Sequence, residues 1–379
     1  MSNTDYKFEG WGAFGPDSIE GKFKWFEYEP KEFADDDLDE VDSRRPTVPV
    51  KILYCGMCAT DLHMASAGWF DMSAFYPLVV GHEIVGEVVR AGPMVEGGLK
   101  VGDIVGIGAQ SDSCLKCARC REHKEEYCDE GQIGTYAAIY KRTSPGSKSR
   151  GGYANYWRGP SHFVVPIPSN LDPAAAAPML CGGVTVFSPL IKYGAGTTAK
   201  DVGVIGIGGL GHFALLFAKA MGAEVTAISH SQRKVEDAKA MGATKFITTH
   251  GHVDDAIKGH ERSLDLIICT TSDPNMPLSD YLRLLRPGGT FVMVGAPEVD
   301  AMPELHPFFF ILNNVHLTGS AIGSPARICE MLQFAGDHNV RPWIKRFPLN
   351  EVNKAVPSMH AGEARYRYVL VNEDNGGKL

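Results

Sequence analysis

Short apolar runs separated by glycine and proline characterise roughly the first 110 residues of the chain. The strongest strand candidates are residues 51–54, 83–90 and 103–107. This pattern predicts a β-rich domain, with an antiparallel, barrel-like sheet as the expected shape. The acidic run 35–40 and the following Ser-Arg-Arg-Pro at 43–46 predict a solvated loop, because like charges repel one another in a packed setting. We assign no chemistry to this loop.

The pattern changes after about residue 184, where apolar strands alternate with helical segments. A helix that begins near Cys181 leads into this region. Six strands with intervening helices predict a doubly wound parallel sheet of the Rossmann type. The expected strands are residues 201–206, 224–229, 245–249, 264–269, 290–294 and 316–320.

The C-terminal residues predict a return to the first domain. A helix is expected at residues 325–336, and residues 365–371 have the apolar and aromatic content of a strand. The predicted α/β organisation is therefore a β-rich domain in two chain segments around a central parallel-sheet domain. Its expected parts are 1–183, with a cysteine-rich lobe at about 111–130, the central domain 184–321, and 322–379.

Composition and charge limit the classes of partner. The chain has 379 residues, 44% of them hydrophobic, and a formal net charge of -8. Nucleic acids and anionic membranes favour clustered lysine and arginine, so neither is expected as a partner. The apolar run 202–218 contains many glycines and suits a strand, loop and helix better than a membrane span. The polar N-terminus lacks a secretory signal, so we expect a cytoplasmic protein.

Four of the nine cysteines lie within fifteen residues of one another. The spacing Cys114-x2-Cys117-x2-Cys120-x7-Cys128 can supply four thiolates to a closed, tetrahedral zinc site, which would be structural because it has no open position. Four exposed free thiols and an iron-sulfur cluster are the alternatives. A zinc-binding interaction module would account for this lobe but not for the rest of the chain.

A second group of possible ligands lies in residues 55–63 and at Gly81-His82-Glu83. Cys55 and Cys58 form a C-x-x-C pair, which can be a metal clip, a redox dithiol or two small buried residues at a strand end. Local spacing alone leaves these three interpretations open.

The glycine-rich stretch Gly206-x-Gly208-Gly209-Leu210-Gly211 follows a predicted strand and opens a predicted helix. In that context it predicts a dinucleotide site, because the glycines allow a pyrophosphate to approach backbone amides at the helix N-terminus. A glycine-rich turn without a ligand is the alternative.

The end of the second predicted strand in this region indicates which dinucleotide is bound. It carries no carboxylate to bond a ribose hydroxyl, but has Ser229, Ser231, Arg233 and Lys234. Hydroxyls and cations can bind a 2′-phosphate, so NADP(H) is predicted over NAD(H). Alternatively, Ser231 caps the next helix while both cations face solvent.

Together, these motifs show a family resemblance over essentially the whole chain. The sequence resembles the zinc-dependent medium-chain alcohol dehydrogenases of the cinnamyl alcohol dehydrogenase type. This resemblance implies a GroES-like catalytic domain beside the Rossmann domain, two zinc ions per chain and a homodimer. The matching residues are 58–63, 81–83, the four clustered cysteines, 180–185, 206–212, 319–323 and 365–368.

The resemblance also implies roles for individual residues. Cys58, His82 and Cys181 would hold the catalytic zinc, with Glu83 able to enter the coordination shell. Zinc with an open position can polarise a carbonyl or lower the pKa of a bound alcohol. Further cofactor contacts are implied at Gly295, Ser320, Ile322 and Arg367.

A proton relay is implied beside the zinc ligands. Thr60 would contact the substrate oxygen and pass its proton toward His63, while Asp61 would orient His82 through the other ring nitrogen. The alternatives are a helix cap for Thr60, a helix N-terminal charge for Asp61 and a surface position for His63. Trp69 and Phe70 could line the substrate side or belong to the core.

The expected reaction is the interconversion of primary alcohols and aldehydes with NADP(H), on small aromatic (cinnamyl-type) or medium-chain substrates. The alternative within the same fold is a reductase of an activated C=C or C=N bond. Two positions depart from the family pattern. Ala59 replaces a basic residue often found beside the zinc cysteine, and Ala321 stands where plant enzymes carry a bulky aromatic. Ala59 leaves the cofactor phosphates more dependent on the glycine loop, and Ala321 predicts a different or wider pocket.

Overall fold

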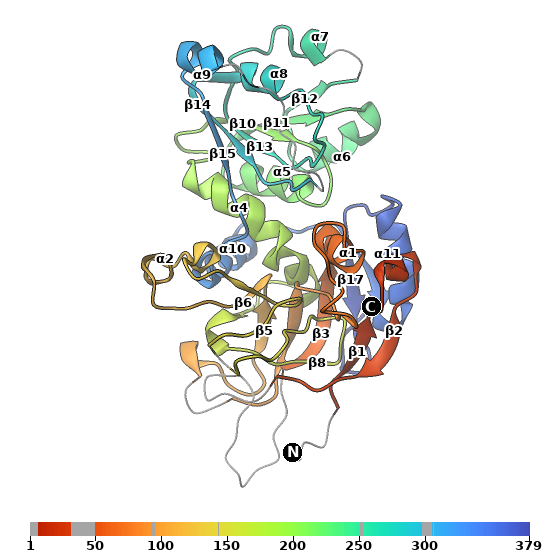
Figure 1. Ribbon diagram of the computed structural model, residues 1–379. Coiled ribbons are helices and arrows are strands. Elements are labelled where there is room, and N and C mark those ends of the chain that lie inside the picture. The colour runs from red at the N-terminus through yellow and green to blue at the C-terminus, as the bar shows by residue number, and fades with distance from the viewer. Residues whose placement is uncertain are drawn as a thin grey trace. The chain divides into compact units, whose positions relative to one another are not determined.

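The computed structural model describes residues 7–31, 50–91, 95–142, 144–250, 253–297, 305 and 307–379 (Figure 1). The predicted acidic loop at 35–46 lies outside these residues. The chain forms two compact units, which we describe separately. Unit 1 contains Met1–Cys181, Gly323–Gly336 and Trp343–Leu379, and unit 2 contains Gly182–Ile322 and Asp337–Pro342.

Unit 2 is built on a six-stranded parallel sheet with the strand order β12-β11-β10-β13-β14-β15. This order is that of a Rossmann fold and confirms the predicted sheet. The central strands are continuous apolar runs, as expected for a parallel sheet whose two faces are both covered. The strands are β10 (Asp201–Ile205), β11 (Glu224–Ser229), β12 (Lys245–Thr248), β13 (Leu264–Cys269), β14 (Leu285–Met293) and β15 (His316–Gly319).

After α4, short helices alternate with these strands (Figure 1). Apolar side chains of the last three helices pack in one cluster with residues of the strands. The apolar run 202–218 forms β10 and most of α5. No single helix in the described ranges is both long and apolar enough to cross a membrane. The helices are α4 (Gly182–Lys192), α5 (Gly211–Ala220), α6 (Val235–Ala240), α7 (Val253–Ile257), α8 (Leu278–Arg283) and α9 (Pro307–Asn313), with a 3-10 turn η6 (Gln232–Lys234).

Strand β14 begins earlier than the sequence predicted. Pro287-Gly288-Gly289 has the composition of a turn, so only residues 290–294 were expected to be extended. In the structure β14 starts at Leu285, and its register with β13 shifts between Leu264 and Leu266. This irregularity accommodates the proline and glycines within a strand.

Unit 1 is centred on a largely antiparallel sheet with the order β16-β17-β3-β4-β5-β9, while β8 also pairs with β3. β17 lies antiparallel to β3, which confirms the predicted return of the C-terminal strand. The strands are β3 (Val50–Met57), β4 (Ile84–Val88), β5 (Ile104–Ile107), β8 (Tyr156–Trp157), β9 (Val164–Pro166), β16 (Ile344–Pro348) and β17 (Arg367–Val371).

Two small sheets complete unit 1. One is the β1–β2 hairpin and the other joins β6 to β7 in the cysteine-rich lobe. They comprise β1 (Glu9–Gly12), β2 (Lys24–Glu27), β6 (Gln110–Asp112) and β7 (Ile133–Gly134). The helices are α1 (Ala59–Ala65), α2 (Ala118–Arg121), α3 (Pro173–Ala176), α10 (Pro325–Asp337) and α11 (Val352–His360). The last residue of α10 belongs to unit 2. The 3-10 turns are η1 (Pro16–Glu20), η2 (Glu96–Gly98), η3 (Glu125–Tyr127), η4 (Ser161–Phe163), η5 (Ala177–Leu180) and η7 (Leu349–Glu351).

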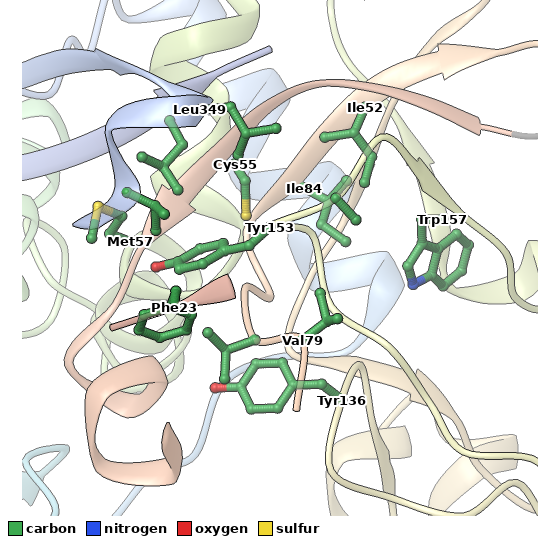
Figure 2. Packing of buried hydrophobic residues seen from close by; sticks show 14 of the residues in the cluster. Phe23, Ile52, Cys55, Met57, Val79, Ile84, Tyr136, Tyr153, Trp157 and Leu349 are labelled. Carbon is green, nitrogen blue, oxygen red and sulfur yellow. The ribbon is translucent and has the colours of Figure 1, made fainter. Parts of the chain in front are cut away.

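The core of unit 1 lies against the β3–β4 pair. Figure 2 shows the sulfur of Cys55 pointing toward the ring of Tyr153, with Ile52 and Ile84 nearby. The Cys55 thiol is buried in this cluster, and burial raises its pKa well above the usual cysteine value. Cys55 is therefore a packing residue of the core. The two cysteines of the C-x-x-C pair have different surroundings, because Cys58 lies in a cluster with His82, Glu83 and Cys181.

Candidate metal centres and cofactor loop

The first candidate site gathers side chains from three segments of unit 1. The donor atoms of Cys58, His82, Glu83 and Cys181 all lie within 4.8 Å of one another, and all four residues are buried. Cys58 follows β3 as the N-cap residue of α1, and His82 and Glu83 precede β4. Cys181 follows η5. The sheet thus brings together residues that lie up to 123 positions apart in the chain.

The chemistry of this cluster fits a zinc ion. His82 Nε2 and Glu83 Oε2 are buried without a hydrogen-bond partner among the described residues. Buried polar atoms are nearly always paired, so these two indicate a missing ligand. A hydrogen bond from the Cys181 thiol lowers the pKa of Cys58 well below the usual cysteine value. Two sulfurs and one imidazole are donors that zinc prefers.

Asp61 connects the start of α1 to the imidazole of His82. Its side chain is 1% exposed, and Oδ2 accepts a hydrogen bond from the backbone N–H of Cys58 at 2.9 Å. Oδ1 lies 2.9 Å from His82 Nδ1 and accepts a bond from the backbone N–H of Gly81 at 3.1 Å. Asp61 thus caps the helix and also orients His82. Because Nδ1 is held in this way, Nε2 is left for a metal.

Tyr136 is a residue of this network that the sequence reasoning missed. Its hydroxyl donates to Asp61 Oδ1 at 2.7 Å and lies 3.2 Å from His82 Nδ1. The ring is buried, and burial raises the pKa of its hydroxyl well above the usual value. No spacing signal in the sequence identifies Tyr136, because it lies 75 residues from Asp61. The fold alone brings the two side chains together.

We expect Tyr136→Phe to weaken metal binding at this site by roughly tenfold, because Asp61 loses a donor and His82 is held less firmly. The measurement is the loss of zinc to a chelator of graded strength, with zinc counted per chain. Tyr140→Phe is the matched control, since the Tyr140 hydroxyl is also buried but donates to Ser111 Oγ. Equal zinc retention in the two variants would contradict this role for Tyr136.

Glu83 forms a buried ion pair with Arg367 of β17, whose Nη2 donates to Glu83 Oε1. Burial raises the pKa of the Glu83 carboxyl to about 7, although the Arg367 guanidinium opposes the rise. Gly56 makes room for this carboxylate, since a Cβ there would lie 2.1 Å from Glu83 Oε2. Arg367 was expected to contact the cofactor. The structure places it, 4% exposed, beside the metal cluster, and its cofactor contact remains a prediction.

The residues of the predicted relay lie on α1. Thr60 is partly buried, and its Oγ1 accepts a hydrogen bond from Cys58 Sγ at 3.6 Å. Cys58 is the N-cap residue, so the capping alternative for Thr60 is wrong. The ring of His63 stacks on Trp69, with centroids 4.6 Å apart, whereas Phe70 is 65% exposed. Trp69 therefore supports His63, and Phe70 is not a core residue.

The second candidate site is the cysteine-rich lobe. The sulfurs of Cys114, Cys117, Cys120 and Cys128 lie within 4.8 Å of one another. The Sγ atoms of Cys117 and Cys120 are 3.5 Å apart, and those of Cys114 and Cys120 are 3.9 Å apart. Tetrahedral zinc with bonds of about 2.3 Å separates its sulfurs by about 3.8 Å. The lobe therefore has the dimensions of a closed zinc site.

Backbone donors also favour thiolates in this lobe. The N–H of Cys117 donates to Cys114 Sγ at 3.4 Å, and that of Cys120 donates to Cys117 Sγ at 3.5 Å. The hydrogen bond from the backbone of Cys120 lowers the pKa of Cys117 to about 7. All nine cysteines are free thiols, so no disulfide competes for these sulfurs.

In unit 2 the glycine loop joins β10 to α5. Gly206 has φ +84°, and a Cβ on Gly211 would lie 1.8 Å from the carbonyl oxygen of Gly206. Only glycine fits at either position. A Cβ on Gly208 would meet nothing within 4 Å, so space is open above the loop. Gly209 and Leu210 complete the turn into the helix. This geometry suits a pyrophosphate at the α5 N-terminus.

The other predicted cofactor residues of unit 2 lie at the carboxyl ends of the parallel strands, where this fold binds dinucleotides. Ser229 ends β11, Gly295 follows β14, and Ser320 follows β15. The Ser320 N–H donates to the carbonyl of Met293 at 3.1 Å. The carbonyl of Ile322 accepts a bond from Ser188 Oγ.

The region after β11 is compatible with a 2′-phosphate. Ser231 is the N-cap residue of η6, but its side chain makes no capping hydrogen bond. Arg233 is exposed. Lys234 donates from Nζ to the carbonyl oxygen of Ile207, which places its ammonium at the glycine loop. The alternative in which both cations face solvent is therefore wrong for Lys234.

Comparisons with known proteins identify the family. Residues 209–337 match the model described as zinc-binding dehydrogenase, and residues 45–169 match the alcohol dehydrogenase GroES-like domain. NADP-dependent alcohol dehydrogenase 6 of Saccharomyces cerevisiae is 41% identical over 349 residues, covering 92% of both chains.

Two similar structures cover nearly the whole chain. A cinnamyl alcohol dehydrogenase from Sorghum bicolor is 35% identical with a TM-score of 0.86, covering 98% of this chain and 99% of its own. The CAD of Helicobacter pylori, complexed with NADP(H), is 33% identical with a TM-score of 0.83, covering 96% and 98%. From the two family models and these full-length relatives, it follows that this chain belongs to the zinc-binding dehydrogenases with an alcohol dehydrogenase GroES-like domain.

Proposed function

We propose that this protein is a zinc-dependent, NADP(H)-linked alcohol dehydrogenase that interconverts primary alcohols and aldehydes. The observation that carries the proposal is the buried donor cluster of Cys58, His82 and Cys181, in which His82 Nε2 has no partner among the described residues. The two cysteine-containing clusters support two zinc ions per chain. Relatives named NADP-dependent alcohol dehydrogenase and cinnamyl alcohol dehydrogenase support the reaction, and the second name supports an aromatic substrate, with a medium-chain substrate as the alternative.

A zinc ion held by Cys58, His82 and Cys181 would supply Lewis acidity toward the substrate oxygen. The surrounding side chains then have distinct tasks. Asp61 and Tyr136 hold the His82 ring in one orientation, and burial excludes water from the thiols. The Arg367 guanidinium pairs with the Glu83 carboxylate, so this negative charge is compensated inside the site.

Proton transfer is assigned to residues on α1. Thr60 carries a hydroxyl within 3.6 Å of Cys58 Sγ, which is a suitable position from which to exchange a proton with a substrate oxygen. His63 lies one turn further along the same helix and is only partly buried. An imidazole there can accept the proton on one ring nitrogen and release it toward solvent.

Preference for NADP(H) follows from the residues after β11. We expect a much higher kcat/KM with NADPH than with NADH, measured by cofactor oxidation with cinnamaldehyde and a panel of aliphatic aldehydes.

Arg233→Gln should lower kcat/KM for NADPH about tenfold and leave kcat/KM for NADH unchanged, because only NADPH carries the 2′-phosphate. Lys239→Gln on α6 is the control, since Lys239 pairs with Glu236 at the surface. Equal efficiencies with both cofactors would contradict NADP specificity.

A homodimer and a cytoplasmic location complete the proposal. α9 exposes Phe308, Ile311 and Leu312, and the neighbouring β15 is an edge strand of its sheet. Exposed apolar residues beside an open strand edge are typical of an interface between subunits. The nine free cysteines are compatible with a reducing compartment.

A further inference from the structure

We propose that a surface cavity of unit 1 binds small organic cations, such as alkylammonium ions, at a site separate from the metal cluster. The cavity has a volume of about 180 Å³. The β1–β2 hairpin forms one side. The ends of β16 and β17 and the residues that follow them form most of the remaining lining. Figure 1 shows β1, β2 and β17 near the C-terminus. This function goes beyond the proposed dehydrogenase reaction.

Strand geometry separates this cavity from the metal cluster. Both sites use β17, but Arg367 begins the strand beside Glu83, whereas Val371 ends it at the cavity. Four residues of extended chain place the two positions about 13 Å apart. Asn372 also lines the cavity, is 3% exposed and donates from Nδ2 to Asn155 Oδ1 at 3.0 Å.

Two tryptophans supply the aromatic wall. Trp11 of β1 and Trp25 of β2 are opposite each other in the hairpin register. Their rings meet edge to face, with centroids 5.6 Å apart and planes inclined by 71°. Trp25 is 40% exposed, although large aromatic side chains are normally buried. The paired indoles therefore offer a pre-organised surface to a ligand.

Another part of the cavity lining is negative. Glu373 and Asp374 are exposed, and neither has an ion-pair partner among the residues that the structure describes. Among the described residues that line the cavity there is no lysine, arginine or histidine. A phosphate or carboxylate would be repelled here. A cation would instead be attracted both by the carboxylates and by the π-electrons of the indole rings in the lining.

A neutral sugar fits this cavity less well than a cation. Sugars need hydrogen-bond donors as well as acceptors, but the amides of Asn155 and Asn372 are already bonded to each other. Asn350 is the exposed amide that remains. The two carboxylates would also stay without compensating charge. An alkylated ammonium can interact with both groups of lining residues. Its methyl groups would contact the indole rings, and its positive charge would be attracted by the two carboxylates.

The test is calorimetric titration of the full-length protein with tetramethylammonium chloride, in the absence of NADP(H), against sodium chloride at equal ionic strength. We expect saturable binding with a Kd in the millimolar range. Trp25→Leu should weaken it at least about fivefold, and Asp374→Asn several-fold. Glu27→Gln is the control, because it removes a surface carboxylate of the same hairpin that pairs with Lys7 and does not line the cavity.

Three results would overturn the proposal. One is no saturable heat up to roughly 100 mM, far above the expected Kd. Another is affinity unchanged by Trp25→Leu in a variant whose circular dichroism matches the parent. The third is an equal loss in Glu27→Gln, which would indicate nonspecific attraction to an acidic surface. Dehydrogenase rates are measured separately and should not change in Trp25→Leu, so failure of the proposed function would not be mistaken for failure of this site.

Discussion

Cys58→Ser is expected to lower kcat/KM at least about a thousandfold and to reduce the zinc content from two ions per chain to one. The reason is that Cys58 supplies one of two sulfurs in a buried cluster with His82 and Cys181. Loss of a Lewis acid removes several kcal/mol of transition-state stabilisation, and each 1.36 kcal/mol corresponds to tenfold in rate. The measurements are steady-state kinetics with NADPH and metal analysis of the purified variant.

Cys55→Ala is the matched control for Cys58→Ser. Cys55 lies three residues earlier in the chain, but its thiol is in the hydrophobic core near Tyr153 (Figure 2). We expect this variant to keep two zinc ions and nearly full activity, with a modest loss of stability from the small cavity it creates. If Cys55→Ala lost the metal while Cys58→Ser retained it, the assignment of the two thiols would have to be reversed.

Cys120→Ser is expected to remove the other zinc ion and to lower the melting temperature by roughly 10 °C, because metal binding in a closed site is coupled to folding. Cys120 is buried, and its sulfur lies within 3.9 Å of both Cys114 Sγ and Cys117 Sγ. The lobe has little apolar surface of its own to compensate. Thermal denaturation and zinc analysis together test this prediction.

Cys329→Ser provides the comparison for the cysteine-rich lobe. Cys329 lies on α10 outside both clusters and is partly buried. Its substitution should leave the zinc content at two and change the melting temperature little. Catalysis by Cys120→Ser at low temperature should persist, because the catalytic cluster does not include this lobe. A Cys120→Ser protein with two zinc ions and unchanged melting would contradict a structural zinc here.

Much of the fold followed from local sequence patterns. β11 and β13 begin and end at the predicted residues, because continuous apolar runs bounded by turn residues leave few alternatives. β14 was only partly predicted, since Pro287 and two glycines are compatible with a turn and only the pairing with β13 keeps them extended. The acidic loop at 35–46 lies outside the described residues, so that prediction stays open.

The candidate site was predictable from the sequence only in part. The spacing of the four clustered cysteines indicates their common role, because residues three apart in a tight turn can reach one metal. Cys58, His82 and Cys181 were identified by family resemblance, and the structure brings them together. Trp69 was left open between core and substrate side, and its stacking on His63 could not be read from its position in the chain.

The sequence by itself determined the two unit types, the cysteine-rich lobe and the glycine loop, because each depends on residues close together in the chain. Tertiary structure decided what distant side chains do. Arg367 meets Glu83 across 284 residues, and Tyr136 reaches Asp61 across 75. The order of strands in the unit 1 sheet brings these groups together. Burial then requires each charge or hydroxyl to find a partner, and no local pattern specifies which partner that is.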